Sequence, residues 1–151
     1  MQRLIAALRD AGIDTNIIVH AEPAHSSQAA AEVLEIDVAQ IAKSVIFGTA
    51  ASGRAVLVIA SGANRVSEVL VADAIGEAIG KADAAFVKAH TEFSIGGVAP
   101  LGHLNSPIAL LDQTLLRFDL VYSAAGHPNT GFPVGPAALA RAPGAKICAV
   151  A

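Results

Sequence analysis

A glycine-rich segment, Phe93 to His103, has the residue types and spacing most suggestive of chemistry. It places three glycines and Pro100 between two apolar stretches. Glycine lacks a Cβ and tolerates a positive φ, while proline fixes its own φ and restricts the preceding Ala99 to extended conformations. Such a loop can bring bare backbone amides close to a ligand. The same residues also suit a bulge or tight bend in a sheet, so this segment alone leaves both interpretations open.

A second candidate is Lys43, which lies inside an otherwise apolar, β-branched run from Gln40 to Gly48. A cation in such a run is costly unless it has a partner. Together with the glycine-rich segment, Lys43 predicts a binding or catalytic site. The alternative is that its charged end merely extends from a strand end into water.

Two further residues are candidates with ordinary alternatives. Asp112 ends an apolar strand, where it could orient a partner, but it is equally suited to cap a turn or helix before Leu115. His127 lies in a loop and could donate to a substrate carbonyl or hydroxyl. An exposed loop histidine without a role is the competing interpretation.

Several reaction classes lack their sequence signals. The five histidines, His25 among them, show no metal-ligand spacing and no accompanying cysteine cluster. The GxSxG elbow of α/β hydrolases is absent, as are the phosphate loop and the GxGxxG fingerprint. We therefore expect neither a metal nor a nucleotide cofactor.

Composition predicts a single domain over residues 1–151. Hydrophobic residues make up 54% of the chain and aromatic residues only 4%, so no aromatic platform for stacking bases is expected. The net charge of −3 argues against binding long nucleic acids through their phosphates, and no DNA partner is expected. The lone Cys148, the lack of an export signal and the lack of a long apolar run predict a soluble, cytoplasmic protein without a membrane partner.

The order of expected elements favours a mixed α+β fold over a doubly wound parallel one. Helices are expected at 2–11, ended by Gly12, at 28–34, capped by Ser26 or Ser27, and at 67–75, 83–90 and 136–141. Strands are expected at 15–20, 42–49, 54–60, 107–111, 119–124 and 145–150, with a Gly- and Pro-rich stretch at 126–136. The expected architecture is a mixed, largely antiparallel sheet or barrel surrounded by short helices.

Three motifs, in this order, resemble the YbaK/prolyl-tRNA synthetase-associated family of aminoacyl-tRNA editing domains. They are Ala42-Lys43-Ser44, the loop from Gly96 to Gly102, and Leu111-Asp112. The resemblance spans nearly the whole chain and is strongest in the lysine strand and the GxxxP loop. It implies a mixed α/β domain that hydrolyses the ester bond of a wrongly charged tRNA, without a metal or a nucleotide.

The resemblance also implies roles for individual residues. Lys43 would lie near the 3′-terminal adenosine and its phosphate, and Ser44 would lie beside the substrate. The amides from Gly96 to Ala99 would face the aminoacyl group, where Gly97 would act with Lys43 in catalysis and help to stabilise an oxyanion. Further residues implied to bind substrate are Ser27, Val98, Ala99, Pro100, Asp112 and His127.

The sequence leaves the substrate and two other functions open. Small amino acids such as Ala, Cys, Ser or Thr are expected, on tRNA-Pro or another tRNA, and a synthetase could supply affinity that this acidic chain lacks. One alternative is a non-catalytic module that uses the same loop to bind a small ligand or a protein. Another is a small esterase with His127 as base and Asp112 as its orienting partner.

Overall fold

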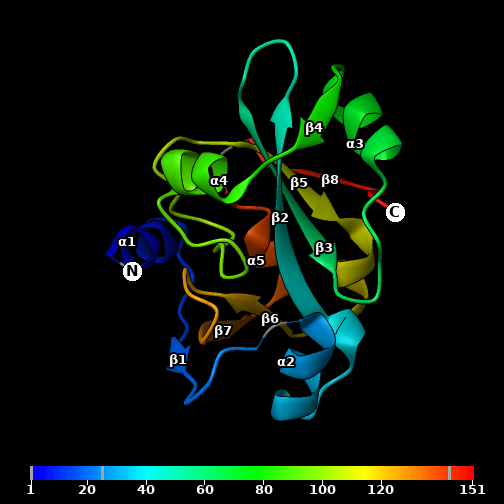
Figure 1. Cartoon of the computed structure of the whole chain (residues 1–151). Helices are drawn as coiled ribbons and strands as arrows, with labels where there is room; N and C mark the ends of the chain where they lie inside the picture. Colours follow the sequence, from blue (N-terminus) through cyan, green and yellow to red (C-terminus); the bar gives the residue numbers. More distant parts are fainter. Residues whose placement is uncertain (1, 25, 143) are drawn as a thin grey trace.

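The computed structural model describes residues 2–24, 26–142 and 144–151, and a single sheet runs through them (Figure 1). Its strands are β1 (Ile18–Val19), β2 (Ile41–Thr49), β3 (Ala55–Ser61), β4 (Ile79–Lys81), β5 (Ile108–Asp112), β6 (Val121–Ala124), β7 (Thr130–Val134) and β8 (Lys146–Cys148). The order across the sheet is β1-β7-β6-β2-β3-β5-β8, with β4 paired to the end of β2.

Antiparallel and parallel pairings both occur in this sheet. β2 is antiparallel to β3 and β4, and β7 is antiparallel to β1 and β6. The pairs β2–β6, β3–β5 and β5–β8 are parallel. This mixed, mostly antiparallel arrangement confirms the α+β fold expected from the element pattern.

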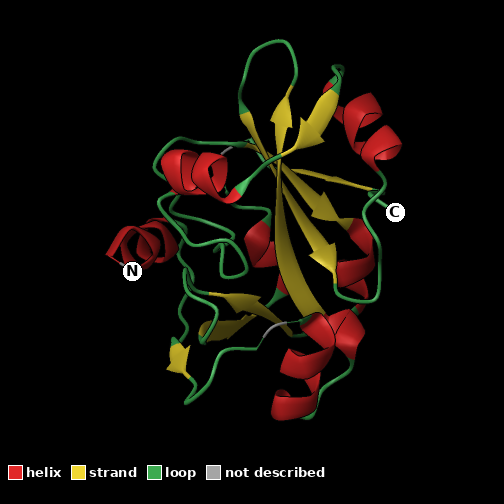
Figure 2. Ribbon diagram, in the orientation of Figure 1, coloured by secondary structure: helices red, strands yellow, loops and turns green. Residues whose placement is uncertain are grey.

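Short helices lie around the sheet (Figure 2). They are α1 (Gln2–Asp10), α2 (Ser27–Leu34), α3 (Glu68–Ile75), α4 (Ala84–Thr91) and α5 (Pro136–Leu139), with the 3-10 helices η1 (Val38–Gln40) and η2 (Gln113–Arg117). Ser26 caps α2, because its Oγ accepts a hydrogen bond of 3.0 Å from the Ala29 N–H. Ser27 is therefore the first residue inside the helix rather than its cap.

Two strands, β4 and β7, lie where the sequence predicted none, and β1 is shorter than the expected strand at 15–20. β4 and β7 contain glycine or proline, which have low strand propensity. Proline is tolerated at Pro133 because β1 pairs only with Thr130 and Gly131, so β7 is an edge strand beyond them. Strand pairing thus overrode local propensity at both places.

The β2–β3 hairpin forms the centre of the molecule, and every residue of β3 is buried. Its register pairs Lys43 with Ala60 and Ser44 with Ile59. Successive strand residues point to opposite faces, so Lys43 and Ser44 belong to different faces of the sheet. Ile59 belongs to the larger of two apolar clusters and Ala60 to the smaller. The rigid hairpin thus fixes two polar side chains in opposite directions.

Candidate active site

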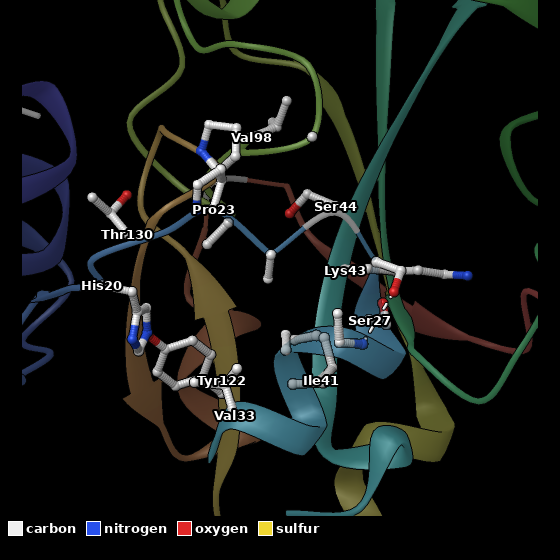
Figure 3. Close-up of a pocket in the computed structure, with 18 of the residues that line it drawn as sticks. His20, Pro23, Ser27, Val33, Ile41, Lys43, Ser44, Val98, Tyr122 and Thr130 are labelled. Atoms are coloured by element: carbon white, nitrogen blue, oxygen red, sulfur yellow. Dashed lines mark hydrogen bonds between the residues drawn. The ribbon is translucent and has the colours of Figure 1, made fainter. Parts of the chain in front are cut away.

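A cavity of about 460 Å³ lies beside the first half of β2 (Figure 3). Its walls come from the segment before α2, from α2 itself, from β2, from the loop around Gly96 and from β6 and β7. Of the residues predicted from sequence, five line this cavity: Ser27, Lys43, Ser44, Gly96 and Val98. The other five lie outside its lining: Gly97, Ala99, Pro100, Asp112 and His127.

Lys43 and Ser44 present their polar atoms in opposite directions (Figure 3). The Ser44 Oγ is buried and has no hydrogen-bond partner in the described part of the chain. The Lys43 side chain runs away from Ser44, and its Nζ donates a hydrogen bond of 2.8 Å to the backbone carbonyl of Asn64. Ser44 therefore presents an unsatisfied hydroxyl at the cavity, while the Lys43 ammonium is directed away from it, toward the Asn64 carbonyl.

Two opposing effects act on the charge of Lys43. Burial disfavours the cation and lowers the pKa of Lys43 below its ordinary value, and the negative charge of Asp112 partly offsets this. A partly buried cation with a lowered pKa is a frequent property of functional sites.

The loop wall of the cavity is shaped by two neighbouring glycines with different surroundings. The Gly97 N–H donates to the Ser94 carbonyl at 3.0 Å, and Gly96 has a φ of +85°, as the third residue of a type II turn requires. A Cβ on Gly96 would meet no atom within 4 Å, but a Cβ on Gly97 would lie 2.3 Å from the backbone carbon of His127. Glycine is therefore needed at position 96 for its positive φ, and at position 97 to let the His127 backbone pack closely.

The amides of this loop differ in whether they already have an acceptor. The Gly97 N–H is occupied by the turn, and the Gly97 carbonyl accepts from the Gly126 N–H at 2.8 Å. Within the described residues, the N–H groups of Gly96 and Val98 donate to no backbone carbonyl. Both residues line the cavity, so each brings a backbone N–H without a backbone acceptor to its loop wall.

The backbone of His127 packs against the loop that carries Gly97. The His127 N–H and carbonyl both contact the Thr130 hydroxyl, at 3.3 and 3.0 Å. This reciprocal pair fixes the turn on which Gly97 packs.

The end of the GxxxP segment is fixed by a histidine. The His103 Nε2 lies 2.6 Å from the Ala99 carbonyl, which can only accept, so the ring nitrogen donates. Burial lowers the pKa of His103, although this hydrogen bond opposes the shift. Pro100 lines a separate cavity of about 300 Å³ together with His103. Ala99 is thus held by the His103 ring, and Pro100 lines this second cavity rather than the first.

Asp112 is buried, with 1% of its surface exposed. Its carboxylate accepts from the Ser61 N–H at 3.0 Å, from the Asn64 side-chain amide at 2.9 Å and from the Thr114 N–H at 3.0 Å. The last bond caps η2, as the alternative interpretation of Asp112 predicted. The carboxylate is therefore committed to the protein's own donors.

A family model for the aminoacyl-tRNA editing domain matches residues 21–142, which include the whole cavity wall from α2 to β7. The chain belongs to the aminoacyl-tRNA editing domain family. The resemblance inferred from the lysine strand and the GxxxP loop is thereby confirmed.

Two solved structures and a curated protein are similar to this chain. A crystal structure of a candidate trans-editing enzyme for prolyl-tRNA synthetase superposes with a TM-score of 0.90 at 30% identity, covering 99% of this chain and 94% of that one. Hypothetical protein APE2540 shares the fold at 24% identity, with a TM-score of 0.89 and 98% coverage of both chains. The uncharacterized protein YwhH of Bacillus subtilis (strain 168) is 28% identical over 118 residues, 78% of this chain and 74% of YwhH.

The editing domain also has a polar pair in its cavity that sequence reasoning missed. The His20 Nε2 and the Tyr122 Oη lie 2.7 Å apart, and burial raises the pKa of Tyr122. The Tyr122 ring lies directly over Gly131, where a Cβ would be 2.3 Å from a ring carbon. The two partners are 102 residues apart, and they meet only because β1 and β6 both pair with β7.

Within the described ranges, no three His, Cys, Asp or Glu residues are grouped as a metal site would require. His25 lies outside those ranges, so its place in the structure is not described. The helices of residues 2–24, 26–142 and 144–151 include none long and apolar enough to cross a membrane.

Proposed function

We propose that this editing domain hydrolyses the ester bond between a small amino acid and the 3′ end of a wrongly charged tRNA. The observation that carries the proposal is the set of unpaired polar groups around one cavity. The free N–H groups of Gly96 and Val98 lie in the loop wall, and the buried Ser44 hydroxyl lies in the strand wall. Membership of the editing family and the similarity to a candidate trans-editing enzyme support it.

Lys43 holds the tRNA end in this proposal. An ammonium has three donors, and the carbonyl of Asn64 occupies one, which leaves two for the phosphate of the terminal adenosine. Because the side chain runs away from Ser44, its orientation fits a phosphate at the edge of the cavity better than the ester carbonyl inside it. Lys43 thereby anchors the nucleotide while the aminoacyl group enters the cavity.

The ester itself needs little activation, so positioned backbone amides suffice without a nucleophilic side chain. A water molecule attacks the ester carbonyl carbon, and the N–H groups of Gly96 and Val98 stabilise the oxyanion. A single such donor contributes about 3 kcal/mol in hydrolases. The bond between the acyl carbon and the ribose oxygen then breaks. The hydroxyl group of the water remains on the amino acid, and the other proton of the water goes to the ribose oxygen. The neighbouring ribose hydroxyl orients the water.

The substrate we propose is a small amino acid such as Ala, Ser, Cys or Thr, carried on tRNA-Pro. The cavity wall includes Ala30, Ala42 and Val98 beside the hydroxyl of Ser44. One methylene group changes the free energy that separates two competing substrates by about 1–3 kcal/mol. A pocket of this lining can therefore favour a small amino acid over a larger cognate one. The prolyl-tRNA assignment is supported by the candidate trans-editing enzyme with the same fold.

We also propose that an aminoacyl-tRNA synthetase assists binding in the cytoplasm. The chain carries a net charge of −3, whereas proteins that bind RNA independently through phosphates are usually basic. Recognition would then concentrate on the terminal nucleotide.

Deacylation of a panel of charged tRNAs tests the proposal. tRNA-Pro carrying Ala, Cys, Ser, Thr or Pro is incubated with the wild-type protein, with Lys43→Ala and with Lys88→Ala. Lys88 is the matched control, because its Nζ also donates to a backbone carbonyl, that of Glu92 at 3.0 Å, but it lies outside the cavity lining.

The proposal predicts release of one or more small amino acids by wild type and Lys88→Ala, with Pro spared. Lys43→Ala should be folded and nearly inactive. A folded wild-type protein that releases none of the amino acids would contradict the proposal, and tight binding of the uncleaved ester would then indicate a binding module.

A further inference from the structure

Lys43 and Asp112 lie on the same face of the sheet, on either side of the end of β3. In the antiparallel β2–β3 ladder, Lys43 pairs with Ala60. In the parallel β3–β5 ladder, Ile59 pairs with Leu111, so Asp112 follows beside Ala60 on the face that Lys43 also occupies. The residue between the two charges is therefore a small, fully buried alanine.

Asn64 connects these two charges from the turn that follows β3. Its side-chain amide donates to the Asp112 Oδ2 at 2.9 Å and to the Thr114 Oγ1 at 3.1 Å. Its backbone carbonyl accepts from the Lys43 Nζ at 2.8 Å. Asn64 thus contacts the buried carboxylate of Asp112 through its side chain and the ammonium of Lys43 through its backbone.

The buried carboxylate is a fixed point for this connection. Asp112 also accepts from the Ser61 N–H at the end of β3 and from the Thr114 N–H at the start of η2. Hydrogen bonds to a charged group are stronger than those between neutral groups. The Asn64 side chain is therefore held at a defined distance from the end of β3, and its carbonyl with it.

We propose that Asn64 and Asp112 are positioning residues that hold the Lys43 ammonium in its place against the turn that follows β3. Neither residue lines the cavity, so they act through Lys43 and not on the substrate. Without the bond to Asp112, the turn would be free to carry its carbonyl away from Lys43. The consequence for deacylation rests on the proposed function, whereas the consequence for Lys43 itself does not.

The charge of Asp112 has a second effect in the same direction. It raises the pKa of Lys43 against the larger opposing effect of burial. Removing that charge should therefore lower the pKa further and reduce the fraction of Lys43 that carries a proton at alkaline pH.

Competitive labelling of lysines with acetic anhydride at a series of pH values tests the proposal without a substrate. The reagent attacks only deprotonated amines, and mass spectrometry reports each lysine separately. Lys81, Lys88 and Lys146 are the internal references, because they are the other lysines of the chain. The variants are Asp112→Asn, Asn64→Ala and, as matched control, Thr114→Val, which removes only the 3.1 Å bond of Asn64.

The proposal predicts that Asp112→Asn moves the labelling curve of Lys43 to lower pH and leaves the reference lysines unchanged. Asn64→Ala should increase Lys43 labelling at least about threefold at a fixed pH, while Thr114→Val resembles wild type. Labelling of Lys43 that is unchanged in a folded Asp112→Asn protein, or equal in Asn64→Ala and Thr114→Val, would overturn it. If Asp112→Asn does not fold, the comparison of Asn64→Ala with Thr114→Val decides alone.

Deacylation kinetics give a second measurement. Asn64→Ala should lower kcat/KM about tenfold, mainly by raising KM, because a tether worth one charge-assisted hydrogen bond is lost. Thr114→Val should change it less than threefold. If wild type releases no amino acid but the labelling follows the prediction, the proposed function fails and the positioning roles of Asn64 and Asp112 stand.

Discussion

The two walls of the cavity are built on different physical principles. The strand wall around Lys43 is fixed by charge, through a buried carboxylate, an amide and an ammonium joined by hydrogen bonds of 2.8–2.9 Å. The loop wall around Gly97 is fixed by shape, because its backbone lies directly against that of His127. We therefore expect activity and stability to depend on charge and pH at the strand wall, and on side-chain volume at the loop wall.

The largest effect is expected when the charge is removed from the strand wall. Lys43→Met keeps a side chain of similar length and should lower kcat/KM about 100-fold, equal to about 2.7 kcal/mol of transition-state stabilisation. The melting temperature should stay the same or rise, because burial disfavours the cation in the folded state. Deacylation assays and thermal unfolding check this, and a variant that unfolds several degrees earlier would contradict the account.

The next largest effect is expected when volume is added to the loop wall. Gly97→Ala forces the loop and the His127 turn apart, since its Cβ would lie 2.3 Å from a backbone atom. The free energy of unfolding should fall by about 1–3 kcal/mol, and kcat/KM should fall at least about tenfold. Denaturant unfolding and deacylation assays measure the two quantities.

Gly96→Ala is the matched control for that substitution. Its Cβ would meet no atom, so only the strain of a φ of +85° acts, about 1 kcal/mol. Its activity should stay within about threefold of wild type after correction for the folded fraction. Equal losses in the two variants would show that volume does not distinguish the two glycines.

A smaller effect should appear in the pH dependence of stability. Burial lowers the pKa of His103 below its ordinary value of 6.5, so protonation is disfavoured in the folded state. The stabilising contribution is then complete above pH 6.5 and is lost as the pH falls toward the lowered value. His103→Gln keeps a donor for Ala99, and its unfolding free energy should fall less between pH 7 and pH 5 than that of wild type. An identical decrease in both proteins would exclude His103 as the cause.

The smallest effect is expected at the far side of the cavity. Tyr122→Phe removes the hydrogen bond to His20 but leaves the ring over Gly131. The unfolding free energy should fall by about 0.5–1.5 kcal/mol, as for an ordinary hydrogen bond. Chemical denaturation provides the measurement, and a loss above 3 kcal/mol would mean that this pair has a larger structural role.

Local patterns predicted much of the strand wall and the existence of the loop wall. The hairpin from 42–49 to 54–60, a serine cap of α2 at 26 or 27 and the place of Lys43 on a strand are all encoded within short segments. The separate duties of Gly96 and Gly97 could not be predicted, because both are glycines and only the position of His127 distinguishes them.

The remaining contacts depend on partners far apart in the chain. Asn64 meets Asp112 across 48 residues, and His20 meets Tyr122 across 102. Each contact requires the strand order, and β7, which aligns His20 with Tyr122, was hidden in a Gly- and Pro-rich stretch. No spacing rule within a segment carries such information.

A structure with an uncleavable substrate analogue would show whether the Gly96 and Val98 amides bind the ester carbonyl and whether Lys43 binds the phosphate. The ligand is alanine joined by an amide to the 3′ position of adenosine 5′-phosphate. The account predicts the alanyl carbonyl oxygen within hydrogen-bonding distance of the Gly96 and Val98 N–H groups, and the phosphate within reach of the Lys43 Nζ. An alanyl group outside the cavity, or a carbonyl oxygen facing away from both amides, would contradict it.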